Sequence, residues 1–258
     1  MIPVIAIDGP SASGKGTVAQ RVAEALGFAY LDSGAIYRVT ALAAQRASQE
    51  AVGGLIGLGG LGVAGGADGL DGENTGGVAD ALAAVAGAMP LRFAGGRVWL
   101  GESDVTEAIR SEECGANASR IAVIPPVRAA LLQRQRDFRV APGLVADGRD
   151  MASVVFPHAA LKVFLTATAE ERAWRRVAQL AGIPLKDAKY LIEKEKDAKL
   201  TVLFDSVLSD LQERDRRDAG RAAAPLKQVE GALLLDTTNL SIEAAVAQIL
   251  GWWAGVKK

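Results

Sequence analysis

Gly9-Pro10-Ser11-Ala12-Ser13-Gly14-Lys15-Gly16-Thr17 is a glycine-rich segment with a single lysine, close to the start of the chain. An apolar run, Ile2–Ile7, precedes it, and a helical pattern from Gly14 to Leu26 follows it. A strand, a glycine loop and a helix in this order typically cradle phosphate. The loop turns several backbone N–H groups toward one anion, and the helix adds its positive N-terminal end. We therefore predict a nucleotide phosphate-binding loop over residues 9–17, with Lys15 reaching the outer phosphates as a point charge; the alternative is a glycine-rich turn with a surface lysine.

The composition narrows the class of protein. The chain has 258 residues, of which 50% are hydrophobic, and its formal net charge is −1. The apolar residues are sufficient for a folded core, whereas the balanced charge and the 5% aromatic content argue against a nucleic-acid-binding surface. The single cysteine, Cys114, excludes an internal disulfide and fits a reducing compartment. Because we find no leader peptide and no span of large apolar residues, we expect a cytoplasmic protein that does not enter a membrane.

Neither the lone cysteine nor the lone histidine is expected to take part in chemistry. Cys114 follows Glu112 and Glu113, whose charges disfavour a thiolate, so we expect a structural thiol. His158 follows Phe156-Pro157 and has no second histidine with which to form a metal site. We expect it to lie at the edge of a strand.

Strand and helix patterns alternate along the chain, which predicts an α/β fold with a parallel sheet covered by helices on both faces. With the glycine loop, this is the phosphate-loop (P-loop) NTPase type of sheet. The expected strands are Ile2–Ile7, Phe28–Leu31, Gly143–Asp147, Leu161–Thr166 and Leu233–Asp236. The expected helices are Gly14–Leu26, Tyr37–Gln49, Val127–Arg139, Ala169–Leu180 and Ser241–Trp253.

Three regions depart from this alternation. Residues 51–88 are rich in glycine and alanine, which predicts a loosely packed insert with a short helix from Val78 to Ala86. Residues 91–100 alternate around a Gly-Gly pair, which predicts a hairpin. Residues 185–221 are dense in charge, and apolar residues recur at three- and four-residue spacing from Leu200 to Leu211, which predicts an amphipathic helix.

Arginines occur in clusters that suit the chemistry of phosphoryl transfer. Donor and acceptor phosphates repel each other, and arginine offers a permanent, planar charge that can neutralise them. Arg38 and Arg149 come just after expected strands, where ligands gather in open α/β sheets. The alternative is a solvated helix face with intrahelical ion pairs, which we favour for Arg175 and Arg216 taken singly. The remaining clustered arginines are Arg172, Arg176, Arg214, Arg217 and Arg221.

A magnesium ion would accompany a bound nucleotide, and two residues are candidates to lie near it. The position after Lys15, which usually carries a hydroxyl, is Gly16, and Thr17 follows one position later. Asp147 closes an apolar strand and could orient a hydrated Mg²⁺. Its alternative roles are a helix cap or an ion-pair partner of Arg149.

Two motifs make the interpretation specific. They are Leu31-Asp32-Ser33-Gly34-Ala35-Ile36-Tyr37-Arg38 and Ala146-Asp147-Gly148-Arg149-Asp150-Met151, and together they strongly resemble bacterial cytidylate kinases, of the nucleoside monophosphate kinase family. The resemblance covers nearly the whole chain except residues 51–88 and part of 185–208. It continues through Ala116-Asn117-Ala118-Ser119, Pro126-Val127-Arg128, Arg134-Gln135-Arg136, Glu213-Arg214-Asp215 and Arg221-Ala222-Ala223-Ala224-Pro225-Leu226.

The resemblance implies an enzyme of pyrimidine nucleotide metabolism that uses Mg²⁺ and transfers the γ-phosphoryl group of ATP to CMP or dCMP. It implies one kinase domain over residues 1–258, with a monophosphate-binding insert at about 38–110 and a mobile lid at about 170–221. The implied catalytic residues are Lys15, Arg149, Arg214 and Arg221. The implied ATP contacts are the loop residues 9–17 with Arg172 and Arg176, and the implied CMP contacts are Ser33, Tyr37, Arg38, Ser119, Arg128, Arg149, Asp150, Arg214, Asp218 and Arg221.

Cytosine recognition by these residues is chemically consistent. Cytosine presents an amino donor beside two acceptors, so the Asp150 carboxylate can accept from the amino group and Arg128 can donate to the acceptor edge. Uracil presents the opposite pattern on that edge, and binding it would leave these partners unpaired.

The sequence departs from the family pattern at Ala152-Ser153, where we expect Gly-Thr, at His158, where Asp is common, and in a longer lid. Three rival functions are a related kinase acting on UMP, AMP or shikimate, a nucleotide-dependent switch without catalysis, and a nucleic-acid-binding module. We expect a monomer with small-molecule substrates.

Overall fold

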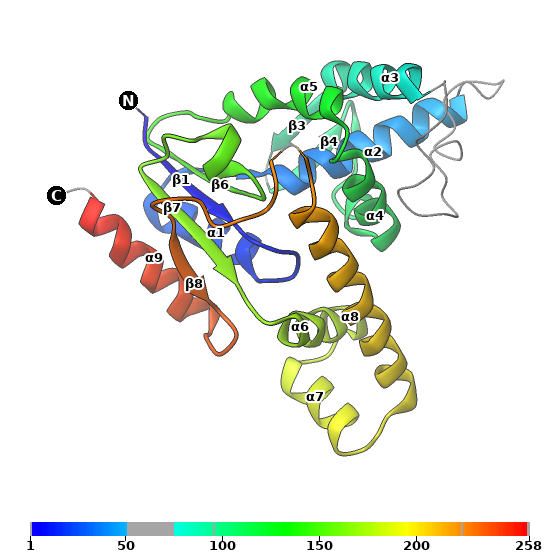
Figure 1. The fold of residues 1–258 in the computed structure, drawn as a ribbon, viewed down its shortest axis with the longest axis vertical. Helices are drawn as coiled ribbons and strands as arrows, with labels where there is room; N and C mark the ends of the chain where they lie inside the picture. Colours follow the sequence, from blue (N-terminus) through cyan, green and yellow to red (C-terminus); the bar gives the residue numbers. More distant parts are fainter. Residues whose placement is uncertain (1, 51–74, 95, 223, 257–258) are drawn as a thin grey trace. The chain divides into compact units, whose positions relative to one another are not determined.

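The computed structural model describes residues 2–50, 75–94, 96–222 and 224–256 (Figure 1). Most of the glycine-rich insert, residues 51–74, for which loose packing is expected, lies outside the described residues. The chain divides into two compact units. The first unit comprises Met1–Leu31 and Phe138–Lys258, and the second comprises Asp32–Asp137.

A five-stranded sheet carries the glycine loop. Its strand order is β2-β6-β1-β7-β8, so β1 lies at the centre. β1 runs parallel to both β6 and β7, and β7 runs parallel to β8, as the predicted fold class requires. The strands are β1 (Val4–Asp8), β2 (Ala29–Asp32), β6 (Leu144–Gly148), β7 (Leu161–Thr166) and β8 (Leu233–Asp236), each within a few residues of the expected bounds.

Helices α1 (Lys15–Leu26) and α9 (Ile242–Val256) pack on this sheet and against each other. Their buried residues join sheet residues such as Ile5 and Val163 in one apolar core. Trp253 of α9 is 4% exposed and meets the Phe28 ring edge-on, with 5.7 Å between ring centroids. Trp253 is therefore part of this apolar core.

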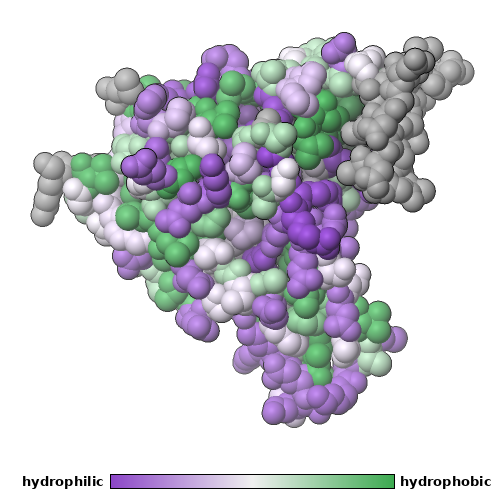
Figure 2. Space-filling model, in the orientation of Figure 1, coloured by the Kyte–Doolittle hydropathy of each residue, from purple (hydrophilic) through white to green (hydrophobic). Residues whose placement is uncertain are grey.

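Three helices form an arm beyond the carboxyl end of β7 (Figure 1): α6 (Ala169–Ala181), α7 (Leu185–Glu193) and α8 (Ala198–Ala219). The predicted amphipathic helix is the first half of α8, whereas α7 was not predicted. Thr168 and Asp197 cap the N-termini of α6 and α8 with their side-chain oxygens. Figure 2 shows mostly hydrophilic side chains over the far end of this arm, near α7, as the charge-dense sequence predicts. The arm has its own small core of Ala173, Val177, Ile192, Val207 and Leu211.

The second unit combines helices with a small antiparallel sheet. The predicted hairpin forms, with Phe93 of β3 paired to Val98 of β4, and β5 adds a third strand beside β4. α3 packs on α5, and α2 packs on α4. The elements are α2 (Ser33–Glu50), α3 (Thr75–Ala88), β3 (Leu91–Ala94), β4 (Arg97–Leu100), β5 (Ser103–Asp104), a 3₁₀ turn (Ala108–Arg110), α4 (Glu112–Ile121) and α5 (Pro125–Arg136).

Capping interactions explain where the helix boundaries differ from prediction. α2 begins at Ser33, four residues early, because the Asp32 Oδ1 accepts a hydrogen bond from the Ala35 N–H at 3.0 Å. α4 was not predicted, and Ser111 caps it by accepting from the Cys114 N–H at 3.2 Å. Among the described residues, none of the helices is both long enough and apolar enough to cross a membrane.

Candidate active site

The glycine loop follows β1 directly, and its backbone requires glycine at Gly9 and favours glycine at Gly14. A Cβ on Gly9 would lie 2.0 Å from the Leu165 carbonyl oxygen, so no larger residue fits beside β7. Gly14, at φ 87°, and Ala12, at φ 58°, both adopt left-handed backbone conformations. Gly14 adopts this conformation without strain, whereas Ala12 adopts it with backbone strain. Such strain is common in functional loops.

Side chains hold the carbonyl groups of this loop. The Ser13 Oγ and Lys15 Nζ donate to the Pro10 carbonyl, at 2.9 and 3.4 Å. The Arg172 Nη1 donates to the Ser11 carbonyl at 3.1 Å. A trans peptide is planar with its C=O and N–H opposed, so fixing a carbonyl also fixes the next residue's N–H. The loop is thereby shaped before any anion binds, and the N-terminus of α1 adds positive charge.

Asp147, at the end of β6, lies beside the loop lysine. Its Oδ1 is 3.8 Å from the Lys15 Nζ, and the Tyr30 hydroxyl donates to its Oδ2 at 3.4 Å. A Cβ on Gly16 would lie 3.2 Å from the Asp147 Oδ2, so this carboxylate approaches the position after the lysine. An ion pair between Asp147 and Arg149 was one alternative from the sequence. In the structure Asp147 pairs with Lys15, and Arg149 pairs with Asp218.

The donor set near the loop fits a magnesium ion that arrives with a nucleotide. The ion prefers oxygen ligands and commonly uses one or two carboxylates together with waters and phosphates. Asp147 supplies a buried carboxylate, and Thr17, two positions after Lys15, is an exposed residue with a hydroxyl. Within the described residues, no group of three or more His, Cys, Asp and Glu could hold a metal by itself.

Asp218, near the end of α8, gathers the arginines predicted to bind phosphate. The carboxylate is 1% exposed, accepts from the Arg149 Nε at 2.9 Å and also pairs with the Arg221 guanidinium. Burial alone would raise the pKa of Asp218, but the charges of Arg149, Arg221 and Arg214 outweigh burial and lower it. Arg149 also donates from Nη2 to the Ser11 Oγ at 2.8 Å, which links this cluster to the loop.

A second buried carboxylate, Asp8, holds the segment that carries Asp150. Its two oxygens accept from the N–H groups of Met151 and Ala152, both at 2.8 Å. Burial raises the pKa of Asp8 to about 7, although these two hydrogen bonds favour the charged form. Asp150 itself is 5% exposed at the turn between β6 and the short helix Met151–Val155.

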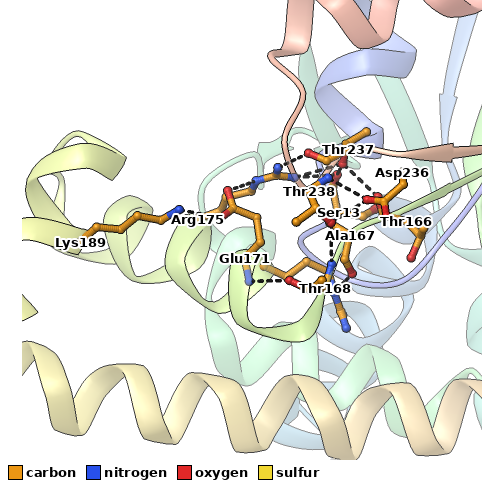
Figure 3. Close-up of polar contacts among 11 residues, drawn as sticks. Ser13, Thr166, Ala167, Thr168, Glu171, Arg175, Lys189, Asp236, Thr237 and Thr238 are labelled. Atoms are coloured by element: carbon orange, nitrogen blue, oxygen red, sulfur yellow. Dashed lines mark hydrogen bonds and ion pairs between the residues drawn. The ribbon is translucent and has the colours of Figure 1, made fainter. Parts of the chain in front are cut away.

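The arginines of α6 differ in their surroundings. Arg172 is 4% exposed and pairs with Asp215 of α8 through both terminal nitrogens, at 3.1 and 2.5 Å. Arg176 lies toward solvent, with its Nη1 2.6 Å from the Gln179 Oε1. For Arg175 the sequence favours a solvated helix face with an intrahelical ion pair. The pair with Glu171 is present, but Arg175 faces the loop and not solvent, because it also donates a hydrogen bond to the Ser13 carbonyl (Figure 3).

The remaining predicted residues belong to the second unit. Ser33 and Ser119 are both 4% exposed, and Tyr37 is 9% exposed. The Arg38 Nη1 donates to the Ile109 carbonyl at 2.7 Å and to the Ser111 carbonyl at 3.3 Å. The Arg128 Nη1 donates to the Ala122 carbonyl at 3.2 Å. Backbone carbonyls thus orient both arginines.

The surroundings of Cys114 agree with the expected structural role, whereas His158 lies in a turn and not at the edge of a strand. Cys114 is buried, and its thiol lies 3.3 Å from the Arg38 carbonyl oxygen. Burial raises the pKa of this thiol, which disfavours the reactive thiolate. His158 is exposed in the turn before β7.

Sequence reasoning assigned no supporting role to Asp215 and Thr237, and it favoured a solvated helix face for Arg175 taken singly. Each acts through a partner far away in the sequence, such as the contact between the Thr237 hydroxyl and the Ser13 carbonyl at 3.0 Å. One available signal was the spacing of Arg172, Arg175 and Arg176, which share one helix face.

A phosphate loop held by arginines at the carboxyl edge of a parallel sheet is the arrangement of the phosphate-loop kinases, and here that of the nucleoside monophosphate kinase class. Comparison with known proteins gives the family. The cytidylate kinase family profile matches residues 5–254. A cytidylate kinase of Chromobacterium violaceum is 50% identical over 256 residues, covering 98% of this chain and 96% of that protein. One of Cupriavidus necator is 47% identical over 257 residues, covering 100% and 98%.

The chain therefore belongs to the cytidylate kinase family, whose members are ATP-dependent phosphotransferases. The resemblance and the fold class inferred from the sequence are confirmed. Among solved structures, a protein titled TT1252 from Thermus thermophilus aligns over 97% of both chains, with 18% identity and a TM-score of 0.39.

Proposed function

We propose that this protein transfers the γ-phosphoryl group of ATP to CMP or dCMP, giving ADP and CDP or dCDP. The observation that carries the proposal is the cluster around Asp218, which holds Arg149 and Arg221 and connects Arg149 to Ser11 of the phosphate loop. We assign the loop to the phosphates of the donor and the arginines to the phosphate of the acceptor. The membership of the chain in the cytidylate kinase family supports this assignment.

In the proposed reaction, the loop and Lys15 bind the outer phosphates of ATP. A phosphate oxygen of CMP attacks the γ-phosphorus, the bond from that phosphorus to the bridging oxygen breaks, and ADP leaves. The second pKa of a phosphate monoester is near 6, so the acceptor oxygen is largely ionised at neutral pH and needs no general base. Arg149, Arg214 and Arg221 neutralise the charge that develops.

Magnesium is part of this proposal as a companion of ATP. When bound, it would neutralise part of the negative charge of the phosphates. Asp147 and Thr17 are the residues that would lie near it. Asp147 additionally holds Lys15 toward the loop, at 3.8 Å.

We assign cytosine recognition to four residues. Asp150 accepts from the amino group, Arg128 donates to the acceptor edge, and Ser33 and Ser119 complete the hydrogen bonds. Arg38 and Tyr37 assist in binding the monophosphate. Asp218 would meet the sugar hydroxyls, and its oxygens can each accept a further hydrogen bond beyond those from Arg149 and Arg221.

We also propose that separate segments of the chain bind the two substrates. The proposed monophosphate-binding part, about 38–110, lies within the second compact unit, which supports treating it as a separate part. The lid, about 170–221, corresponds to α6, α7 and α8, and Arg172 and Arg176 are its proposed ATP contacts.

The test is ADP release from ATP and Mg²⁺ against a panel of acceptors: CMP, dCMP, UMP, AMP, GMP and shikimate. Turnover confined mainly to CMP and dCMP is the expected result. Preferential turnover of another acceptor would keep the kinase chemistry and overturn the assignment of Asp150 and Arg128. ATP binding without turnover of any acceptor would favour a nucleotide-dependent switch.

A further inference from the structure

Arg175 of α6 lies at the centre of the polar network drawn in Figure 3. Its Nη1 donates to the Ser13 carbonyl and to the Thr237 Oγ1, both at 3.2 Å, and its Nη2 donates to the Thr237 carbonyl at 2.5 Å. Its Nε donates to the Glu171 Oε1 at 3.1 Å. All three guanidinium nitrogens are therefore engaged, two of them on the loop or on the turn after β8.

Thr237 supports the same carbonyl from a second direction. The residue is 3% exposed, and its Oγ1 lies 3.0 Å from both the Ser13 and the Thr166 carbonyl oxygens. Its backbone N–H donates to the Thr166 carbonyl at 2.8 Å, which fixes it to the end of β7. Arg175 and Thr237 thus tie the Ser13 carbonyl to two rigid elements.

The network continues outward to α7. The second carboxylate oxygen of Glu171 accepts from the Lys189 Nζ at 2.7 Å. The Glu171 side chain is 11% exposed, whereas those of Arg175 and Lys189 are 23% and 36% exposed, so the carboxylate is the most shielded member of the two ion pairs. Lys189 therefore connects α7 to the loop through Glu171 and Arg175 in sequence.

We propose that Arg175 is a positioning residue for the phosphate loop, and that Glu171 and Lys189 hold it in place. The Ser13 carbonyl shares its peptide plane with the N–H of Gly14. Gly14 is the N-cap residue of α1 and has a left-handed backbone conformation. In a planar trans peptide the two groups point in opposite directions, so clamping the carbonyl directs the Gly14 N–H to the other side. That N–H is one of the donors that a loop of this type offers to phosphate.

An arginine is suited to this role, and a lysine is not an equivalent replacement. The guanidinium fork donates to several acceptors at fixed angles, whereas an ammonium is a point charge on a flexible stem. Arg175→Lys could reach the Ser13 or the Thr237 carbonyl, but not both of them and Glu171 together. The conservative variant should therefore retain part of the function.

The experiment measures the dissociation constant of Mg-ATP by calorimetry without acceptor, together with the KM for CMP and the thermal midpoint. For Arg175→Ala we expect ATP affinity to fall on the order of tenfold, because charge-assisted hydrogen bonds that fix a donor are lost. Arg175→Lys should lose less, and Glu171→Gln and Lys189→Met should each lose a smaller factor. The KM for CMP should change less than twofold in all four.

The matched control is Lys186→Met, which removes an exposed lysine from the same helix as Lys189. Its ATP affinity should equal that of the unmodified protein. If Arg175→Ala lowers the thermal midpoint but leaves ATP affinity unchanged, the residue is merely structural and the proposal is wrong. If that variant does not fold, Arg175→Lys decides in the same way.

This inference rests on the proposed function only for the identity of the nucleotide, and the two can fail separately. ATP binding is measured without acceptor, so a protein that binds ATP but does not phosphorylate CMP would refute the proposed function and leave the role of Arg175 testable. Normal CMP turnover with unchanged ATP affinity in Arg175→Ala and Arg175→Lys would refute the role of Arg175 alone.

Discussion

Replacing Asp218 by Asn should destabilise the protein strongly, because it removes the negative charge from a buried cluster of arginines. The Asp218 side chain is 1% exposed, and those of its partners Arg149 and Arg221 are 16% and 6% exposed. The substitution keeps the shape but leaves two guanidinium groups without their counter-charge and turns an amide N–H toward one of them. Breaking a buried pair in this way costs about 3–5 kcal/mol.

The assay is denaturant and thermal unfolding followed by circular dichroism at pH 7. For a chain of this size, about 3–5 kcal/mol corresponds to a fall in the midpoint of roughly 6–20 °C. Glu243→Gln is the matched control, because Glu243 pairs with Arg21 at the surface and should leave the midpoint nearly unchanged. A decrease in the free energy of unfolding of less than about 1 kcal/mol for Asp218→Asn would show that the negative charge of Asp218 does not stabilise the cluster.

The pH dependence gives a second check on the same residue. The pKa of Asp218 is lowered from its ordinary value of 3.8 in the folded protein. Its contribution to stability is therefore present above pH 3.8 and is lost as the pH falls through the folded-state pKa. The difference in unfolding free energy between the two proteins should be constant near neutral pH and shrink toward pH 3.

Three further predictions concern activity and pH. Arg149→Ala should lower kcat for CMP on the order of 10³-fold while the circular dichroism spectrum is retained, because a charge-assisted partner of the reacting phosphate is lost. Asp150→Asn should lower the ratio of kcat/KM for CMP over UMP by about tenfold, because an amide can also donate to the uracil carbonyl. The raised pKa of Asp8, about 7, means that its favourable contribution is present below pH 3.8 and is lost as the pH rises through 7. Asp8→Asn should therefore flatten the fall in unfolding free energy between pH 5 and pH 8.

Controls make each of these results decisive. Near-normal turnover in Arg149→Ala would remove Arg149 from the reaction, and an unaltered CMP to UMP ratio would remove Asp150 from base recognition. Unfolding curves with the same pH slope in Asp8→Asn and in the unmodified protein would contradict the assignment of a raised pKa to Asp8. Thermal midpoints of all three variants separate loss of function from loss of fold.

The sheet and the loop could be predicted because their signals are local. Each core strand is a short apolar run bounded by turn residues, as in Val4–Asp8, and the glycine loop must follow such a strand. Helix ends were less predictable, because they depend on single capping contacts such as that from the Ala35 N–H to Asp32. α4 was missed for the same reason, since Ser111 defines its start.

The motifs give candidate site residues, but they do not give the partners of those residues. Arg149 and Asp218 are 69 positions apart in the sequence, and their ion pair exists only because α8 returns to the loop. The misplaced assignment of Arg175 to a solvated face has the same origin. Its helix pair with Glu171 is local and was foreseeable, whereas its bonds to Ser13 and Thr237 depend on the tertiary fold.

The most direct test of the account is to follow the γ-phosphate itself. The purified protein is incubated with Mg²⁺, CMP and ATP labelled with ³²P at the γ position, and the products are separated by chromatography. The account predicts label in CDP, at a rate that falls sharply in Arg149→Ala. Label released as inorganic phosphate, or retained in ATP while ATP is bound, would contradict phosphoryl transfer to CMP.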